Sequence, residues 1–358
     1  MHTADRTTLV LSSADIQQLV RKVGLDEFMD QLIDRLSAAM QQLDPTRTHI
    51  PKRSGFNYQQ PHTGLVEWMP IHQLGQQVVI KVVGYHPANP QQYHLPTILS
   101  TISAYDVRTG HLLALIDGVF VTALRTGAAS AIASRCLAHP DSKVLGLIGC
   151  GAQAVAQLHA IQRLFPLEEV YCYDTDTVAM YSLAERCGPL GANLRFRPTP
   201  LEEVVAQADI LCTATSVEVG AGPVFADSDH QTHLHVNAVG ADFPGKVELP
   251  LSFLRKSYVC PDFLDQAVVE GECQQLDLHE IGADIVQLVQ QPADFTHLRT
   301  QTTVYDSTGW ALQDYVVMLL FTDLAKASGV GQFIELEGVT RDVKNPYDFI
   351  WQERPQSA

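Results

Sequence analysis

The pattern of apolar and polar positions divides the chain into three parts, and the first is rich in strands. Residues 14–42 repeat apolar side chains with a helical period. After them, turn-forming sequences separate strand-like segments at 64–69, 77–83, 97–105 and 111–116. This first third is therefore expected to form a mostly antiparallel sheet with helical packing on one face.

The middle part alternates strands and helices. An alanine-rich helix is predicted over 121–138 and another over 201–208. Buried strands are predicted at 143–148, 170–174, 209–215, 233–239, 257–260 and 302–306. This alternation is typical of a doubly wound parallel sheet. A last apolar helix, 310–327, is expected to return to the first part.

The fold class that follows is α/β, with one domain inserted into another. We predict a Rossmann-type parallel sheet over 130–311. The flanking segments, 1–129 plus 312–358, are predicted to form one discontinuous, mainly antiparallel α+β domain. The 358 residues are enough for two domains of about 150 residues each.

Composition narrows the class of protein. The formal net charge of −16 disfavours a nucleic-acid or anionic-membrane partner. Seven cysteines without a CxxC pair indicate reduced thiols, and the pattern predicts no metal site. No export signal is evident, and the longest apolar run near the C-terminus, 315–321, is far shorter than the ~20 residues of a membrane span. We therefore expect a cytoplasmic enzyme.

A glycine turn between a predicted strand and helix is the strongest single motif. Gly149 would allow the tight turn, Gly151 would let the backbone approach a pyrophosphate, and Ala154 would let the helix pack on the strand. Asp174 ends the next strand, where an acid meets a ribose 2′-hydroxyl and favours NAD over NADP. The alternative is a glycine turn in an α/β domain that binds no nucleotide.

Three charged residues stand in unusual surroundings. Glu67 and Lys81 lie within apolar strand sequences, and Arg125 lies on the alanine-rich helix. Each could be functional, since the planar guanidinium of Arg125 suits a carboxylate or phosphate. Each could equally lie on a solvated face. Strand alternation places Lys81 on the face opposite Ile80 and Val82.

Two turns follow predicted strands of the parallel sheet. Asp242 and Lys246 lie in the first turn, and the second is Asp306-Ser-Thr-Gly309. Ligands of such sheets bind outside the carboxyl ends of the strands. The residues alone thus indicate an NAD-linked dehydrogenase of unknown substrate.

Several segments together resemble the ornithine cyclodeaminase/μ-crystallin family, over about residues 20 to 350. They are 66–70, 81–89, 123–126, 148–153, 173–176, 237–246, 270–272 and 306–315. The Arg-Thr pair and the Gly-x-Gly-x-Gln turn are shared across the family, and they support fold and cofactor. The Glu before Met-Pro, the His-Pro-Ala-Asn turn and the Gly-x-Asp-x-Pro-Gly-Lys turn are more similar to its bacterial ornithine cyclodeaminase branch.

The resemblance implies roles for the polar residues. Arg53, with Lys81 and Arg125, would bind the substrate α-carboxylate, and Arg47 competes with Arg53 for that role. Glu67 would hold a cationic amine. Asp242 would be the catalytic acid that moves protons, with Glu67 and Lys81 beside it.

The resemblance also implies a set of cofactor contacts and one further substrate contact. Thr97 would line the substrate pocket. The residues expected to contact NAD are Thr97, Arg125, Thr126, Gly149, Gly151, Ala152, Gln153, Asp174, Thr175, Thr213, Thr215, Val239, Gly240, Lys246 and Ser307.

The implied reaction converts L-ornithine to L-proline and ammonia, with hydride removed from Cα and later returned, so NAD is not consumed. A homodimer built through the sheet-rich domain is implied as well. Alternatives within the family are an amino-acid dehydrogenase, a ketimine reductase, an opine-type synthase or a lysine cyclodeaminase. A non-catalytic binding protein is a further alternative, disfavoured by the joint presence of Glu67, Lys81, Arg125 and Asp242.

Overall fold

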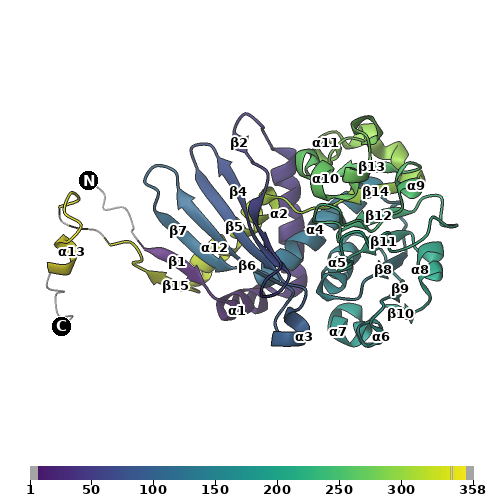
Figure 1. Ribbon diagram of the computed structural model, residues 1–358, viewed down its shortest axis with the longest axis horizontal. Helices are drawn as coiled ribbons and strands as arrows, with labels where there is room; N and C mark the ends of the chain where they lie inside the picture. The colour runs from purple at the N-terminus through teal and green to yellow at the C-terminus, as the bar shows by residue number, and fades with distance from the viewer. Residues whose placement is uncertain (1–6, 339, 341, 352–358) are drawn as a thin grey trace.

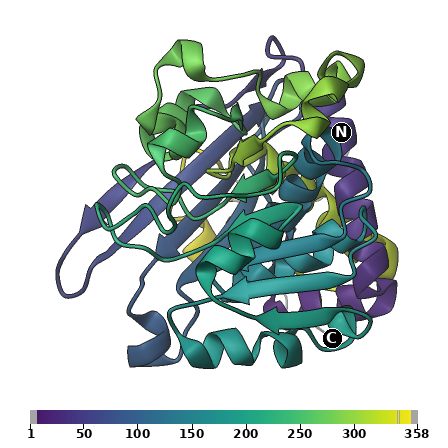
Figure 2. The same cartoon turned by 90° about the vertical axis from the view of Figure 1, so that its right-hand side faces the viewer.

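The computed structural model describes residues 7–338, 340 and 342–351. It contains two sheets, each with its own helices, placed side by side along the long axis of the molecule (Figure 1). One sheet is built from the first third of the chain and a short C-terminal strand. The other sheet is built from the middle of the chain, and Figure 2 shows it from its own side.

The first sheet has eight strands in the order β15-β1-β7-β6-β5-β4-β2, with β3 paired to β4. All neighbours are antiparallel except β1 and β7, which are parallel. The strands are β1 (Thr8–Leu11), β2 (Thr48–His49), β3 (Ser54–Tyr58), β4 (Gly64–Gln73), β5 (Gln77–Tyr85), β6 (Ile98–Asp106), β7 (Leu112–Asp117) and β15 (Gln332–Ile334). The sequence pattern did not reveal β1 and β15, because each offers very few alternating positions.

The predicted helical region 14–42 is two helices. They are α1 (Ser13–Val23), whose N-terminus has a capping box between Ser12 and Asp15, and α2 (Leu25–Gln41). The break falls at Gly24, which has φ +96°, a left-handed conformation that glycine adopts without steric cost. Their apolar faces are buried together with α12 (Ala311–Ser328).

The second sheet has seven parallel strands in the order β10-β9-β8-β11-β12-β14-β13. The order reverses between β8 and β11, which is the switch point where doubly wound sheets bind ligands. The strands are β8 (Val144–Ile148), β9 (Glu169–Tyr173), β10 (Arg195–Pro198), β11 (Ile210–Thr213), β12 (His235–Ala238), β13 (Tyr258–Pro261) and β14 (Thr303–Asp306).

Short helices connect these strands. The α-helices are α5 (Ala152–Gln162), α6 (Thr177–Tyr181), α7 (Leu183–Cys187), α8 (Leu201–Gln207), α9 (Leu251–Leu254), α10 (Leu264–Glu270) and α11 (Ile285–Gln290). The 3-10 helices are η1 (Gly188–Gly191), η2 (Glu272–Gln275), η3 (Leu278–Glu280) and η4 (Pro292–Thr300). Outside this part lie α3 (Asn89–Tyr93) and α13 (Asp348–Trp351).

Helix α4 (Val119–Leu137) lies between the two sheets and contacts α2, α5, β6 and β12. Most of its side chains are buried, which explains why its sequence is apolar all round. Helix α12 returns from the parallel sheet to α2 and β5, as expected. Both observations confirm the predicted fold class, a parallel sheet inserted into a discontinuous antiparallel unit.

The domain boundaries at 129/130 and 311/312 stay a prediction, and residues 1–6 and 352–358 of the outer domain lie outside the described part. Within the described residues, no helix combines the length and the apolar character needed to cross a membrane.

Candidate active site

The glycine turn lies where the strand order of the parallel sheet reverses. Gly149 follows β8 with φ +91°, and a Cβ there would lie 2.6 Å from the carbonyl oxygen of Ala214. A Cβ on Gly151 would meet no atom within 4 Å, so the space over this residue is open. Helix α5 begins at Ala152 and presents its N-terminal N–H groups to that space. The turn therefore has room and backbone donors for a pyrophosphate, and its contacts with the cofactor stay a prediction.

Asp174 follows β9 beside this turn. Its carboxylate accepts a 2.7 Å hydrogen bond from the backbone N–H of Cys150 and a 2.8 Å bond from that of Asp176. These bonds hold the acid at the edge of the glycine turn, where the ribose of a dinucleotide would lie. The neighbouring Thr175 is exposed.

The other residues expected to contact a cofactor lie at the same edge of the sheet. Thr213, Val239 and Ser307 lie at or directly after the carboxyl ends of β11, β12 and β14. Because parallel strands end at one edge, these positions are neighbours of the glycine turn. Ser307 is buried, and Gln153 lies on the first turn of α5.

Glu248 accepts hydrogen bonds from residues that the resemblance assigned to NAD binding. Its carboxylate accepts from the hydroxyls of Thr213 and Thr215, at 2.7 Å and 2.6 Å, and from the backbone N–H of Gly240 at 2.8 Å. The hydroxyls of Thr213 and Thr215 therefore stabilise the loops at this edge. The sequence analysis did not single out Glu248.

A buried charge cluster lies where the antiparallel sheet, α4 and α12 meet. Lys81 Nζ lies 2.9 Å from Asp314 Oδ2, and Arg125 Nε lies 3.2 Å from Asp314 Oδ1. The Lys81 side chain is 1% exposed, that of Arg125 6% and that of Asp314 0%. Lys81 and Arg125 are thus not on solvated faces, which was the alternative interpretation of their positions.

Burial and the nearby Arg125 guanidinium lower the pKa of Lys81 to about 7, against the opposing effect of Asp314. Gly309, with φ +75°, leaves room for Arg125, because a Cβ there would lie 2.6 Å from its Nη1.

Arg53 links the antiparallel sheet to the part of the chain that forms the parallel sheet. Its Nε lies 2.7 Å from Glu270 Oε1 at the end of α10, and its Nη1 lies 3.5 Å from Glu67 Oε2 on β4. Its Nη2 donates to the carbonyl oxygen of Thr308. Arg47, its competitor for the carboxylate role, is exposed at the turn before β2.

Several carboxylates surround Arg53. Burial raises the pKa of Glu270 to about 7, and the negative charges of Glu67, Asp242 and Asp262 add to this effect while Arg53 opposes it. Burial also raises the pKa of Asp262 to about 6, although Thr308 and Gly309 donate hydrogen bonds to it. Glu270 therefore lies within electrostatic reach of all these groups.

Asp242 lies in the loop after β12 and faces the end of β5. Its Oδ1 accepts a 3.1 Å hydrogen bond from Lys246 Nζ, which lies 5.5 Å from the centre of the Tyr85 ring. The Asp242 side chain is 33% exposed, so it is accessible to a ligand. Thr97 immediately precedes β6 rather than beginning that strand, and its carbonyl accepts from His86 N–H.

Sequence reasoning gave no role to Asp314 or Glu270, although both lie in segments that carried the resemblance. A signal for Asp314 was present, because it is a carboxylate that precedes the apolar run of this helix, 315–321. The position of Glu270 gave no comparable signal, since it ends a short amphipathic helix, where an acid is ordinarily solvated.

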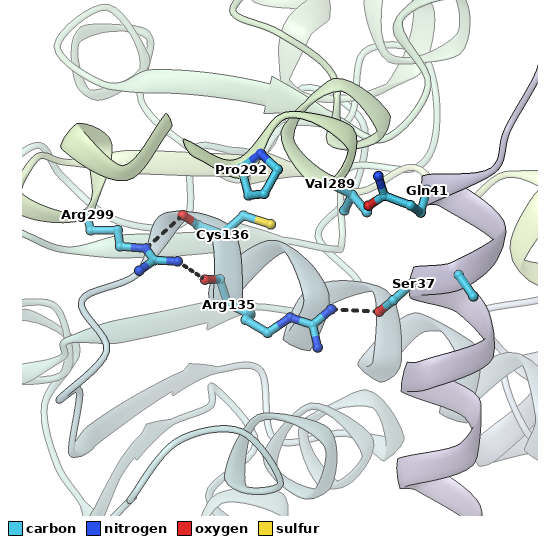
Figure 3. A pocket seen from close by; sticks show the side chains of 8 residues that line it. Ser37, Gln41, Arg135, Cys136, Val289, Pro292 and Arg299 are labelled. Atoms are coloured by element: carbon cyan, nitrogen blue, oxygen red, sulfur yellow. Dashed lines mark hydrogen bonds between the residues drawn. The ribbon is translucent and has the colours of Figure 1, made fainter. Parts of the chain in front are cut away.

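A cavity of about 460 Å³ lies elsewhere, between α2, the end of α4, α11 and η4 (Figure 3). Arg299 donates to the carbonyl oxygens of Arg135 and Cys136, and Arg135 donates to the Ser37 hydroxyl. Arg299 thereby satisfies carbonyl groups at the C-terminus of α4, a structural role. In the part of the chain that the structure describes, no cluster of His, Cys, Asp or Glu could hold a metal ion.

Comparison with known proteins identifies the family. The model of the ornithine cyclodeaminase/mu-crystallin family matches residues 14–329. The chain belongs to this family. Among curated relatives, it is 40% identical to the L-lysine cyclodeaminase of Streptomyces rapamycinicus, over 95% of this chain and 99% of the relative. It is 30% identical to an ornithine cyclodeaminase of Agrobacterium tumefaciens, over 94% and 92% of the two chains.

Solved structures of the family share the fold. A lysine cyclodeaminase, studied for its recognition of L-lysine, L-ornithine and L-2,4-diaminobutyric acid, superposes with a TM-score of 0.93 at 44% identity, over 96% of this chain and 99% of the other. An archaeal alanine dehydrogenase dimer with bound NAD has a TM-score of 0.82 at 30% identity, over 92% and 100%. The resemblance seen in the sequence motifs is thus confirmed.

Proposed function

We propose that this protein is an NAD-dependent cyclodeaminase of L-diamino acids. The observation that carries the proposal is one site that combines buried cations with several carboxylates. Lys81 and Arg125 share the single carboxylate of Asp314, whereas Glu67, Asp242 and Glu270 lie nearby around Arg53. A substrate with an α-carboxylate and a second, cationic amine complements both halves of this site.

NAD fits the edge of the parallel sheet. The open space over Gly151, the N-terminus of α5 and the acid at Asp174 match a pyrophosphate and a ribose with a free 2′-hydroxyl. Family members of known structure bind NAD or NADH. When bound, NAD⁺ would accept a hydride from the substrate Cα and return it after ring closure.

The chain's own residues bind the substrate and move its protons. Lys81 and Arg125 hold the α-carboxylate and orient Cα towards the nucleotide edge. Glu67 holds the distal ammonium group. Asp242, paired with Lys246, accepts a proton from the distal amine, so that this amine can attack Cα of the oxidised substrate. Asp242 then returns a proton to the departing ammonia. Arg53 either assists at the carboxylate, as the resemblance implies, or acts by joining the two units.

The favoured substrate is L-lysine, with L-ornithine second, although the sequence motifs alone placed ornithine first. The greater identity to a lysine cyclodeaminase, 40% against 30% for an ornithine enzyme, supports this order. The two substrates differ by one methylene, which is worth ~1–3 kcal/mol of discrimination in a pocket. Turnover of both is therefore expected, with a preference.

The test is incubation with L-lysine or L-ornithine and a sub-stoichiometric amount of NAD⁺. Pipecolate or proline should form together with an equal amount of ammonia, far in excess of NAD and without accumulation of NADH. Accumulation of NADH with L-alanine, and no cyclic product, would instead favour the dehydrogenase alternative, for which the 30% identity to the alanine dehydrogenase of Archaeoglobus fulgidus is the supporting observation. Wild-type protein incubated with NAD⁺ but without an amino acid serves as the control.

A further inference from the structure

Asp314 lies on the first turn of α12 and directly precedes the apolar run 315–321. Its side chain is fully buried, and it faces two cations from different elements, Lys81 of β5 and Arg125 of α4. Lys81 donates to it at 3.0 Å. The adjacent Gln313 accepts from Arg125 Nη1. One short stretch of α12 therefore fixes the side chains of both cations.

The charges of this cluster do not balance. Two cations share one carboxylate, so a net positive charge stays buried when Lys81 is protonated. Isolated buried charge is costly unless a partner satisfies it. Glu67 and Glu270 are paired with another cation, Arg53, instead. An anionic group of the substrate is the partner that this arrangement lacks.

We propose that Asp314 is a positioning residue, which holds Lys81 and Arg125 in place so that the pair binds the substrate α-carboxylate. This inference rests on the proposed function, because it takes the ligand of the pair to be an amino acid. Asp314 is thus a further functional residue of the site, one to which the sequence motifs assigned no role.

The protonation of Lys81 makes the role of Asp314 measurable. Burial and Arg125 lower the pKa of Lys81, Arg53 lowers it further, and Asp314 is the group that raises it. The strand partners of Lys81 in β4 and β6 are Met69 and Ile102, which do not titrate. Removing the charge of Asp314 therefore moves the pKa of Lys81 below its value of about 7.

The experiment measures kcat and KM of the NAD-loaded enzyme between pH 6 and 9, for wild type and Asp314→Asn. Neutral Lys81 binds a carboxylate weakly, so kcat/KM should fall as pH rises through the pKa of Lys81. In Asp314→Asn this descending limb should shift to lower pH by about one unit or more. At pH 8 the variant's KM should rise about tenfold, with a smaller change in kcat and unchanged NAD affinity. A profile that drops uniformly without a shift would overturn the proposal.

A second measurement does not depend on activity. The Tm deficit of Asp314→Asn relative to wild type should shrink from pH 6 to pH 9, because Lys81 becomes neutral in both proteins. In a Lys81→Met background the deficit caused by Asp314→Asn should not vary with pH. A deficit that is constant in both backgrounds would mean that Asp314 is a structural contact alone, and would contradict the inference. Asp314→Asn protein that folds at pH 9 but not at pH 6 would support the inference, as a shrinking Tm deficit would. Failure to fold at both pH values would contradict the inference.

The two proposals fail in distinguishable ways. Cyclic product from wild type with an unshifted Asp314→Asn profile would remove the positioning role and leave the cyclodeaminase. Turnover of L-alanine alone, with a profile that shifts in the variant, would remove the cyclodeaminase and leave the positioning role. Turnover of no amino acid would overturn both.

Discussion

The Nε atom of Arg53 lies 2.7 Å from Oε1 of Glu270, although 217 residues separate them in the printed sequence. The pair joins the segment before β3 to the end of α10. Arg53 is 10% exposed and also contacts Glu67 and the Thr308 carbonyl oxygen. A guanidinium with several separate partners has a fixed orientation, so the position of Arg53 depends on both the antiparallel and the parallel sheet.

Replacing Arg53 by alanine should lower kcat/KM by about 100-fold, because a buried carboxylate partner would be left without its cation. Arg47→Ala is the matched control, since Arg47 is exposed and was the competing candidate in the sequence. We expect its kcat/KM to stay within about twofold of wild type. Steady-state kinetics of both variants measure these changes. Equal decreases in kcat/KM would contradict a specific role of Arg53 in substrate binding.

The two glycines of the nucleotide turn should respond differently to alanine. Gly149→Ala places a Cβ 2.6 Å from the Ala214 carbonyl oxygen in a left-handed backbone, so it should cost about 2–4 kcal/mol of unfolding free energy. Gly151→Ala meets nothing within 4 Å and should keep the stability of wild type. Its Kd for NAD should nevertheless rise at least about tenfold, because the methyl group occupies space needed by the pyrophosphate. Chemical denaturation and calorimetric NAD titration measure the two effects, and tight NAD binding by Gly151→Ala would refute the placement.

Asp242→Asn should reduce kcat by about 10²–10⁴-fold, the usual size of a lost general acid or base. Affinity for NAD and Tm should change little, since the Asp242 side chain is a third exposed and asparagine can still accept the hydrogen bond from the buried Lys246. The exposed Asp229, substituted in the same way, is the control for loss of a negative charge. Retention of turnover by Asp242→Asn would show that another group transfers the protons.

His235 should make the protein sensitive to acid. It is fully buried between Thr303 and Asn237, and burial lowers its pKa to about 3. In the unfolded chain His235 binds a proton near pH 6.5, whereas in the folded chain it stays neutral down to about pH 3. The free energy of unfolding therefore decreases as pH falls from 6.5 towards 3. His235→Gln should remove roughly 3 kcal/mol of the loss between pH 7 and pH 4. Urea denaturation at both values measures this, with His49→Gln, at an exposed position, as the control whose pH dependence should equal that of wild type.

The outer face of the antiparallel sheet should form a homodimer contact. Phe56, Trp68, Val82 and Leu99 share this face by their strand register, and Phe56, Val82 and Leu99 are 68%, 39% and 38% exposed. A contiguous apolar strip of this kind favours association with a second copy. Light scattering should give the mass of a dimer, and Val82→Glu should shift it towards the monomer. Val178→Glu on α6 changes an apolar position outside this sheet that is more exposed than Val82, and it should leave the mass unchanged.

Most helices and strands of the parallel sheet, and the glycine turn, could be predicted from the sequence alone. The strand, glycine turn and helix at 143–154 are local, and each residue's conformation there follows from its neighbours. The return of α12 to the first unit also followed from its apolar length. Short strands such as β1 and β15 could not be found in this way, because they are defined by the partners they pair with rather than by their own pattern.

Which charged residues contact one another became visible only in the packed structure. Lys81, Arg125 and Asp314 come from three elements, and their strand or helix positions allowed a solvated face as readily as a buried one. The same holds for Arg53 and Glu270, which no spacing along the chain relates. Local periodicity reports the direction of a side chain relative to its own element, whereas burial and pairing depend on which elements pack together. The charge balance of the candidate site is therefore a property of the packing of α4 and α12 against the antiparallel sheet.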